Sequence, residues 1–470
     1  MSKKTTFGVI VGNRGFFPDH LAVEGRKEIL GILEQQGYGT VCVTPEDTYL
    51  GSVVTREDAH KCADLFKKHA DCIDGILITL PNFGEERGIA DALRLAGLDV
   101  PVLVQAYPDD LSKLSLADRR DSFCGKMSCC NNLTQYGVDY SLTSQHTMDP
   151  SSAAFAADLK WFGAVCRVVK GLKGARIGAI GTRPAAFNTV RYSEKILEAN
   201  GISVEPIDLS EILARIEKLD DAAECVQKRF NAVKSYVCLG ETPDVALMKM
   251  AKFAAVVDEW MEANELQATA VQCWTSIEEN YGIVPCGVMS MMSERLIPGA
   301  CEVDVTGAIG MYSLALAAEQ PAALVDWNNN YGDDPDKCVV FHCSNFPKSC
   351  FSDVKMRWQD IIGASVGNEN TFGACVGRVK PGPFTFARVS TDDLVGEVRA
   401  YVGQGEFTDD PLDTFGGVGV ARIEELQSLL QVICQMGFEH HVALTHAQVG
   451  AAIAEAWGNY LDWDVYVHGE

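Results

Sequence analysis

The first 110 residues alternate short apolar runs with amphipathic stretches, and this alternation constrains the fold more than any other feature of the sequence. Helical patterns occupy the stretches at 21–36 and 56–69. Strand–helix alternation of this kind is typical of a doubly wound α/β domain with a parallel sheet. The apolar runs have the length of buried parallel strands; they are FGVIVG (7–12), TVCVTP (40–45), GILITLP (75–81) and VPVLVQA (100–106).

A second series follows a helical segment near 151–171. Its strand-like runs are ARIGAIG (175–181), ATAVQCW (268–274), ACEVDV (300–305) and AALVDW (322–327). From about residue 338 short β-like pieces appear between Gly and Pro residues, and the tail returns to helix–strand–helix around HVALTH (441–446). We therefore expect two doubly wound parallel-sheet domains, 1–165 and 166–335, followed by a β-rich C-terminal domain, 336–470.

Charge and cysteine content narrow the class of protein. The net charge of −24 disfavours nucleic acid and anionic membranes as partners, because both would repel the chain. The 17 cysteines form no C-x-x-C pair, so we interpret them as small buried side chains in a reducing compartment. The sequence has no signal-type segment at its start and no apolar stretch of membrane-spanning length. A cytoplasmic protein is expected.

Sequence motifs exclude several enzyme classes. The chain lacks G-x-x-x-x-G-K-[ST] and a G-x-G-x-x-G that follows a strand, which disfavours a nucleotide-binding protein or an NAD-linked oxidoreductase. It also lacks the G-x-S-x-G elbow of α/β-hydrolases.

Carboxylates near strand ends are the first candidate ligands. Glu302 and Asp304 would face the same side of a strand through ACEVDV, and two carboxylates on an apolar strand need solvent, a cation or a metal. Glu278 and Glu279 follow Trp274, where the preceding run ends. The alternative is that Glu278 and Glu279 only interact with the dipole at a helix N-terminus.

A histidine cluster offers the other donor type. His440, His441 and His446 lie close together after Glu439, although neighbouring positions of a strand face opposite sides. A Glu, Asp and His set suits Mn²⁺ or a similar divalent ion. The alternative is a histidine cluster without a metal.

Five segments together resemble the L-fucose isomerase family and, more distantly, L-arabinose isomerase. The resemblance covers most of the chain. The segments are EHHVALTHAQVGAAIAEA (439–456), CEVDV (301–305), GNRG (12–15), PNFGEERG (81–88) and FCGKMSCCNNL (123–133).

The resemblance implies a metal-ligand set. It places the family's metal-binding His on His441 and its Asp on Asp304. The family's metal-binding Glu falls on Asn280 by an ungapped count, so this sequence departs from the pattern there. Glu278 or Glu279 is the favoured substitute. The same carboxylates, Glu278 or Glu279 and Asp304, would move the proton between the two reacting carbons.

The resemblance also implies an activity. The chain would be an aldose–ketose isomerase that uses Mn²⁺, with Mg²⁺ or Co²⁺ as alternatives, and proceeds through a cis-enediol. A homo-oligomer, trimer or hexamer, would place its sites near subunit interfaces. Residues expected to bind the sugar are Asn13, Arg14, Asn82, Phe83, His342, Ser344, Asn345 and His440.

The substrate stays open at this point. L-fucose or D-arabinose is the first expectation, and a 6-modified hexose such as sulfoquinovose is the alternative. Arg14, Arg87 and Asn13 are candidates to bind a sulfonate. A non-catalytic cytosolic sugar-binding protein is the rival of another class.

Overall fold

A computed structural model of the chain describes residues 4–343 and 345–469. They group into two compact units. The first contains the residues up to Lys170 together with Glu455–Asp462, and the second contains Gly171–Ala454 together with the residues from Trp463 onward. Most of both later domains expected from the sequence falls within the second unit.

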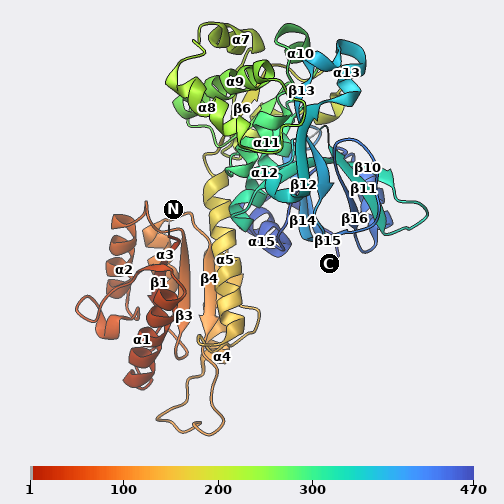
Figure 1. The fold of residues 1–470 in the computed structure, drawn as a ribbon. Coiled ribbons are helices and arrows are strands. Elements are labelled where there is room, and N and C mark those ends of the chain that lie inside the picture. The colour runs from red at the N-terminus through yellow and green to blue at the C-terminus, as the bar shows by residue number, and fades with distance from the viewer. Residues whose placement is uncertain (1–3, 344, 470) are drawn as a thin grey trace. The chain divides into compact units, whose positions relative to one another are not determined.

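The first unit is built on a parallel sheet with helices on both faces (Figure 1). The strand order is β2-β1-β3-β4-β5. The four apolar runs expected as strands form the first four strands, which confirms the doubly wound pattern. The strands are β1 (Thr6–Val11), β2 (Gly39–Val41), β3 (Gly75–Leu80), β4 (Val102–Ala106) and β5 (Ser141–Leu142).

Alternate residues of these strands face opposite helical layers. Ile10 and Ile78 pack in one core with residues of α2, α3 and α4. Phe7 faces the other side, where its ring centroid lies 5.5 Å from that of Phe162 in α5. The helices are α1 (Asp19–Gln35), α2 (Arg56–Lys68), α3 (Glu86–Ala96), α4 (Ser122–Gln135) and α5 (Ala153–Leu172), with a short turn η1 (Tyr49–Gly51).

The second unit contains a smaller parallel sheet in the order β7-β6-β8-β9. Its strands are β6 (Arg176–Ile180), β7 (Ser203–Ile207), β8 (Ala268–Val271) and β9 (Gly299–Cys301). The accompanying helices are η2 (Asn188–Val190), α6 (Glu194–Ala199), α7 (Leu209–Glu217), α8 (Glu224–Lys234), α9 (Asp244–Ala263), α10 (Ser276–Asn280) and α11 (Cys286–Glu294).

The β-rich part of this unit is a nine-stranded mixed sheet in the order β12-β13-β16-β11-β10-β17-β14-β15-β18. A further pairing of β15 with β16 closes six antiparallel strands into a ring filled by aromatic and aliphatic side chains. The strands are β10 (Ala322–Asn330), β11 (Lys337–His342), β12 (Phe351–Trp358), β13 (Phe372–Val379), β14 (Gly382–Asp392), β15 (Glu397–Thr408), β16 (Gly417–Arg422), β17 (His441–Thr445) and β18 (Asp464–Val467).

Helix α12 (Val305–Ala318) joins the two sheets of the second unit. It contacts β6 and β8 of the parallel sheet and β14 and β17 of the ring, and almost all of its residues are buried. The remaining elements are η3 (Lys348–Cys350), α13 (Asp360–Val366), η4 (Asn368–Asn370), α14 (Leu426–Met436), α15 (Gly450–Glu455) and η5 (Ala456–Tyr460).

Two strand expectations for the second series are corrected. AALVDW forms the start of β10, but β10 pairs with β11 and β17 in the nine-stranded sheet and not with the parallel sheet. ACEVDV stops being a strand at Cys301, where β9 ends. Buried apolar runs identify a strand but not its neighbours, because pairing is decided by contacts distant in sequence.

Among the helices of the described residues, none combines the length and the apolar composition that crossing a membrane requires.

Candidate active site

A sharp turn after β9 sets the position of the first carboxylates. Glu302 and Val303 have φ values of 55° and 56°, in the left-handed region that β-branched residues rarely adopt. Asp304 then forms the N-cap of α12, and its Oδ1 accepts a hydrogen bond of 2.8 Å from Gly307 N. The expectation that Glu302 and Asp304 share one strand face is therefore wrong, because the chain turns between them.

Asp304 is held by a completely buried arginine. Arg388, from β14, donates from Nη1 to Asp304 Oδ2 at 2.5 Å and from Nη2 to Asp304 Oδ1 at 3.0 Å. Its Nε donates to Glu439 Oε2 at 3.0 Å, and Glu439 Oε1 accepts from Ser390 Oγ at 2.8 Å. Two carboxylates thus share one guanidinium in the core, and the bidentate contact fixes the Asp304 carboxylate in one orientation.

The electrostatics of this pair favour ionised groups. Burial alone would raise the pKa of Asp304, but Arg388 and His441 hold that pKa well below its ordinary value. Burial alone would lower the pKa of Arg388, whereas Asp304 and Glu439 keep it above its ordinary value. Both side chains are therefore charged at neutral pH.

His441 connects this pair to a second group of donors. Its Nδ1 lies 2.8 Å from Asp304 Oδ2, while its Nε2 faces Asp326 Oδ1 at 3.3 Å and Glu302 Oε2 at 3.8 Å. His342 Nε2 lies 3.6 Å from the same Glu302 oxygen. Strand register explains part of this arrangement, because Asp326 of β10 stands directly opposite His441 of β17.

These donors fit a divalent metal ion. The ligand atoms of Glu302, His342 and His441 lie within 4.8 Å of one another, and Asp326, His440 and His441 form a second such group. Among the described residues, Glu302 Oε2, His441 Nε2 and Asp326 Oδ1 are buried without a hydrogen-bond partner. Buried polar atoms are rarely left unpaired, and oxygen with imidazole nitrogen suits Mn²⁺, Fe²⁺ or Zn²⁺.

Binding of a metal ion would displace a proton from this cluster of carboxylates and histidines. Burial alone would lower the pKa of His342, but Cys343 and Glu302 hold it well above its ordinary value. Burial raises the pKa of Asp326, against the opposing effect of His342 and His441. Protons and a divalent metal ion would therefore compete for the same donor atoms.

The structure distinguishes the two glutamates that the sequence left as alternatives. Glu278 is 1% exposed, and neither of its carboxylate oxygens has a hydrogen-bond partner in the described part of the chain. Burial raises its pKa to about 8, and nearby Cys343 and Glu279 act in the same direction. Glu279 is exposed.

His440 lies at the edge of the cluster. Its side chain is 42% exposed, and its Nε2 is 3.5 Å from Asp326 Oδ1. Phe187 covers both histidines, with ring centroids 5.3 Å from His440 and 5.4 Å from His441. The same ring meets Trp274 edge-on. An aromatic cover of this kind limits access of water to the donors beneath it.

The segment after β11 contains two further expected sugar-binding residues. Asn345 is buried, and among the described residues its amide atoms have no hydrogen-bond partner. Ser344 lies outside the described residues.

The four expected residues of the first unit form a separate cluster at the ends of β1 and β3. Asn82 Nδ2 donates to Asn13 Oδ1 at 2.7 Å, and Arg14 N donates to Asn82 Oδ1 at 3.2 Å. The Arg14 guanidinium lies 4.1 Å from the ring centroid of Phe83 and pairs with Glu86. The structure thus brings these four together within their own unit.

Comparison with protein families identifies the class of enzyme. A model described as fucose/sulfoquinovose isomerase, N-terminal domain, matches residues 8–173, and one described as L-fucose isomerase, C-terminal domain, matches residues 340–468. The chain belongs to this isomerase family. It is therefore a sugar isomerase, an intramolecular oxidoreductase that acts between aldose and ketose, as the sequence resemblance implied.

Similar proteins share one name. A sulfoquinovose isomerase of Alkalicoccus urumqiensis is 25% identical over 311 residues, 65% of this chain and 68% of the relative. One of Priestia aryabhattai is 25% identical over 305 residues, 65% of this chain and 67% of the relative. A third, from Clostridium sp. (strain MSTE9), is 28% identical over 142 residues, 30% of this chain and 32% of the relative.

Sequence reasoning left out several side chains that the structure of this isomerase brings to the site. Asp326 and Arg388 were each a lone charge within an apolar strand pattern, which is the signal that could have singled them out. Glu302 was noticed as part of ACEVDV but not chosen as a ligand. Phe187 lies in a loop whose position no local pattern predicts.

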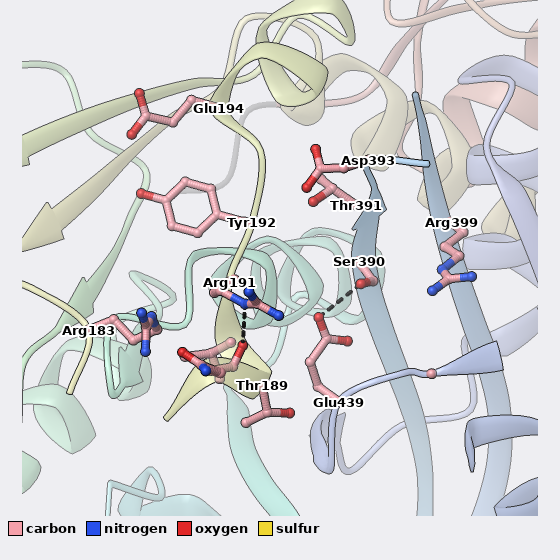
Figure 2. A pocket seen from close by; sticks show the side chains of 13 residues that line it. Arg183, Thr189, Arg191, Tyr192, Glu194, Ser390, Thr391, Asp393, Arg399 and Glu439 are labelled. Atoms are coloured by element: carbon pink, nitrogen blue, oxygen red, sulfur yellow. Dashed lines mark hydrogen bonds between the residues drawn. The ribbon is translucent and has the colours of Figure 1, made fainter. Parts of the chain in front are cut away.

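A polar cavity of about 640 Å³ is lined in part by Glu439, which also accepts a hydrogen bond from Arg388. Figure 2 shows Glu439 and Ser390, joined by their hydrogen bond, at the wall of this cavity. Arg183 and Arg191 also line it, and in the described part of the chain both donate to backbone carbonyl oxygens and neither forms an ion pair. The cavity can therefore receive a polar or anionic molecule.

Replacing Arg388 by methionine should strongly destabilise the isomerase. The substitution leaves Asp304 and Glu439 as buried carboxylates without their cation, which costs about 3–5 kcal/mol. Arg56→Met is the control, because Arg56 is 65% exposed beside Asp91 and a surface pair contributes at most about 1 kcal/mol. Urea unfolding measures both free energies. Similar losses in the two variants would contradict the importance of the buried pair.

Glu278→Gln should remove a pH dependence from the stability of the metal-free protein. Folding raises the pKa of Glu278 from 4.5 to about 8, so the unfolded chain releases this proton at a lower pH than the folded protein does. The free energy of unfolding then falls as pH rises through this window, by about 5 kcal/mol. Urea unfolding across the window measures it, with exposed Glu279→Gln as control. The same slope in wild type and Glu278→Gln would show that Glu278 is not the source.

Proposed function

We propose that this isomerase is metal-dependent and interconverts sulfoquinovose and its 2-ketose. The observation that carries the metal dependence is the buried group of Glu302, His342 and His441, whose donor atoms converge; among the described residues, Glu302 Oε2 and His441 Nε2 have no hydrogen-bond partner. The substrate rests on the relatives named sulfoquinovose isomerase. The homo-oligomer and the cytoplasmic location stay predictions from the sequence.

The metal would be held by Glu302 Oε2, His342 Nε2 and His441 Nε2, with Asp326 at the edge of the group. Mn²⁺ is the ion we propose, with Mg²⁺ or Co²⁺ as alternatives, because one carboxylate and two imidazoles form a borderline-hard donor set. A bound divalent ion supplies Lewis acidity and a template for two neighbouring sugar oxygens. Three protein donors leave positions open for those oxygens.

Asp304, which the sequence pointed to as a ligand, has a different set of contacts in this structure. Both of its oxygens accept hydrogen bonds, from Arg388, Gly307 and His441. We therefore assign Asp304 the task of orienting His441, so that Nδ1 donates to the carboxylate and Nε2 is presented to the metal. Arg388 holds Asp304 in place for this purpose.

Glu278 is our candidate for the group that moves the proton. Isomerisation removes a proton from C2 of the aldose and returns one to C1, while C1 is reduced and C2 is oxidised. A carboxyl group with a pKa of about 8 takes up and releases a proton near neutral pH. Its burial keeps the proton from exchanging freely with water. Glu279, in contrast, is exposed to solvent.

L-fucose or D-arabinose is the second candidate substrate. The C-terminal match to L-fucose isomerase favours it. Membership of an enzyme family sets aside the sugar-binding protein without chemistry.

A panel of aldoses tests the substrate. Purified enzyme with Mn²⁺ is given sulfoquinovose, L-fucose, D-arabinose and D-glucose, and ¹H NMR follows formation of each ketose. We expect the highest kcat/KM for sulfoquinovose, by at least about 100-fold over L-fucose, since a well-placed charge pair contributes about 3 kcal/mol. A higher kcat/KM for L-fucose or D-arabinose would overturn the proposed substrate and leave the isomerase class intact.

Removal of the metal tests the ligand set. EDTA should abolish isomerisation and Mn²⁺ should restore it. Glu302→Gln should weaken Mn²⁺ binding by more than about 100-fold, whereas Asp304→Asn, which removes a residue that orients His441, should weaken it about 10–100-fold. Isothermal titration of the metal-free proteins measures both.

Glu279→Gln is the matched control and should bind Mn²⁺ like the wild type. A fully active metal-free enzyme would refute metal dependence. Unchanged Mn²⁺ binding in Glu302→Gln would show that the metal binds at another site.

A further inference from the structure

Four cysteines from separate segments meet in the core of the second unit. Cys273 follows β8, Cys286 begins α11, Cys301 ends β9, and Cys343 follows β11. The first three are fully buried, and Cys343 is 9% exposed. Tertiary structure alone brings them together, since no two of them are close in sequence.

Three of the four sulfur atoms are close enough to share one ion, and the fourth lies beside one of them. Those of Cys286, Cys301 and Cys343 all lie within 4.8 Å of one another, and Cys273 and Cys301 form a further group of this kind with a carboxylate oxygen of Glu302. In the described part of the chain no other three cysteines form such a group.

The spacing of the three grouped sulfurs approaches that of a tetrahedral thiolate site. A Zn–S bond of about 2.3 Å in tetrahedral geometry places the sulfurs about 3.8 Å apart, which small rotations of the side chains would reach. Packing alone is a weaker explanation. Other buried cysteines of the chain, such as Cys166 and Cys375, belong to no such group among the described residues.

We propose that Cys273, Cys286, Cys301 and Cys343 form a second metal site, which takes a thiophilic divalent ion of the zinc class. Sulfur donors select such an ion over Mn²⁺ or Mg²⁺. Binding releases thiol protons to solvent and involves no redox change. His342 Nδ1, 3.8 Å from Cys343 Sγ, can donate to a thiolate and offset part of the excess negative charge.

The sulfur site and the oxygen–nitrogen group share their backbone. Cys301 directly precedes Glu302, and Cys343 directly follows His342. An ion held by the sulfurs would therefore fix two of the three side chains proposed to hold the catalytic metal. The proposal for the sulfur site itself does not depend on the proposed function.

Cobalt spectroscopy tests the site in the wild-type protein. Reduced, metal-free enzyme is titrated with Co²⁺. We expect a thiolate-to-cobalt charge-transfer band and intense tetrahedral ligand-field bands that saturate at about one equivalent. Added Zn²⁺ should remove these bands, and Mn²⁺ should leave them unchanged. Co²⁺ bound by the oxygen–nitrogen group gives no charge-transfer band, so the readout is independent of isomerase activity.

Variants locate the ligands. Cys286→Ser should lose most of the charge-transfer intensity, whereas Cys375→Ser, a buried cysteine of the same unit outside the group, should keep it. The proposal is overturned by a wild-type titration without a charge-transfer band, or by full intensity in Cys286→Ser. A disulfide among the four cysteines, detected by mass spectrometry of the non-reduced protein, would also overturn it.

Discussion

The buried contact between Arg388 and Asp304 is the interaction on which the rest of the site depends. It fixes the N-terminus of α12, because Asp304 caps that helix, and it fixes the ring of His441, because Asp304 accepts from its Nδ1. Breaking such a pair leaves a carboxylate in the core without its cation, which strongly destabilises the fold. The same guanidinium reaches Glu439, which faces the polar cavity.

The two ring nitrogens of His441 have different contacts, one that orients the ring and one that faces the proposed metal ligands. One nitrogen of the ring is occupied by a carboxylate that is itself fixed by an arginine, and the other faces donors that lack partners. Orienting contacts of this kind raise the basicity of an imidazole and preserve its direction. Glu302 and Val303, which have positive φ values, contribute to the same arrangement. The turn that they form places the Glu302 carboxylate beside His441 Nε2.

Much of the fold could be predicted from local pattern, and the candidate site only in part. Apolar runs such as 75–81 became strands because buried parallel strands need continuous apolar sequence. ACEVDV failed as a strand beyond Cys301, since its pattern contains no sign of the turn that the packing of α12 imposes. Asp326 was missed because its partner His441 stands opposite it only through the pairing of β10 with β17.

The sequence by itself determined that the chain folds into α/β layers with a β-rich part, and it pointed to a sugar isomerase with carboxylate and imidazole donors. Only the tertiary structure decided which donors converge. It buried Glu278 and exposed Glu279, tied Asp304 to Arg388, and gathered four scattered cysteines beside Glu302 and His342. The physical reason is distance along the sequence. Strand and helix patterns arise among neighbouring residues, whereas burial, charge pairing and ligand geometry arise between residues far apart in the chain.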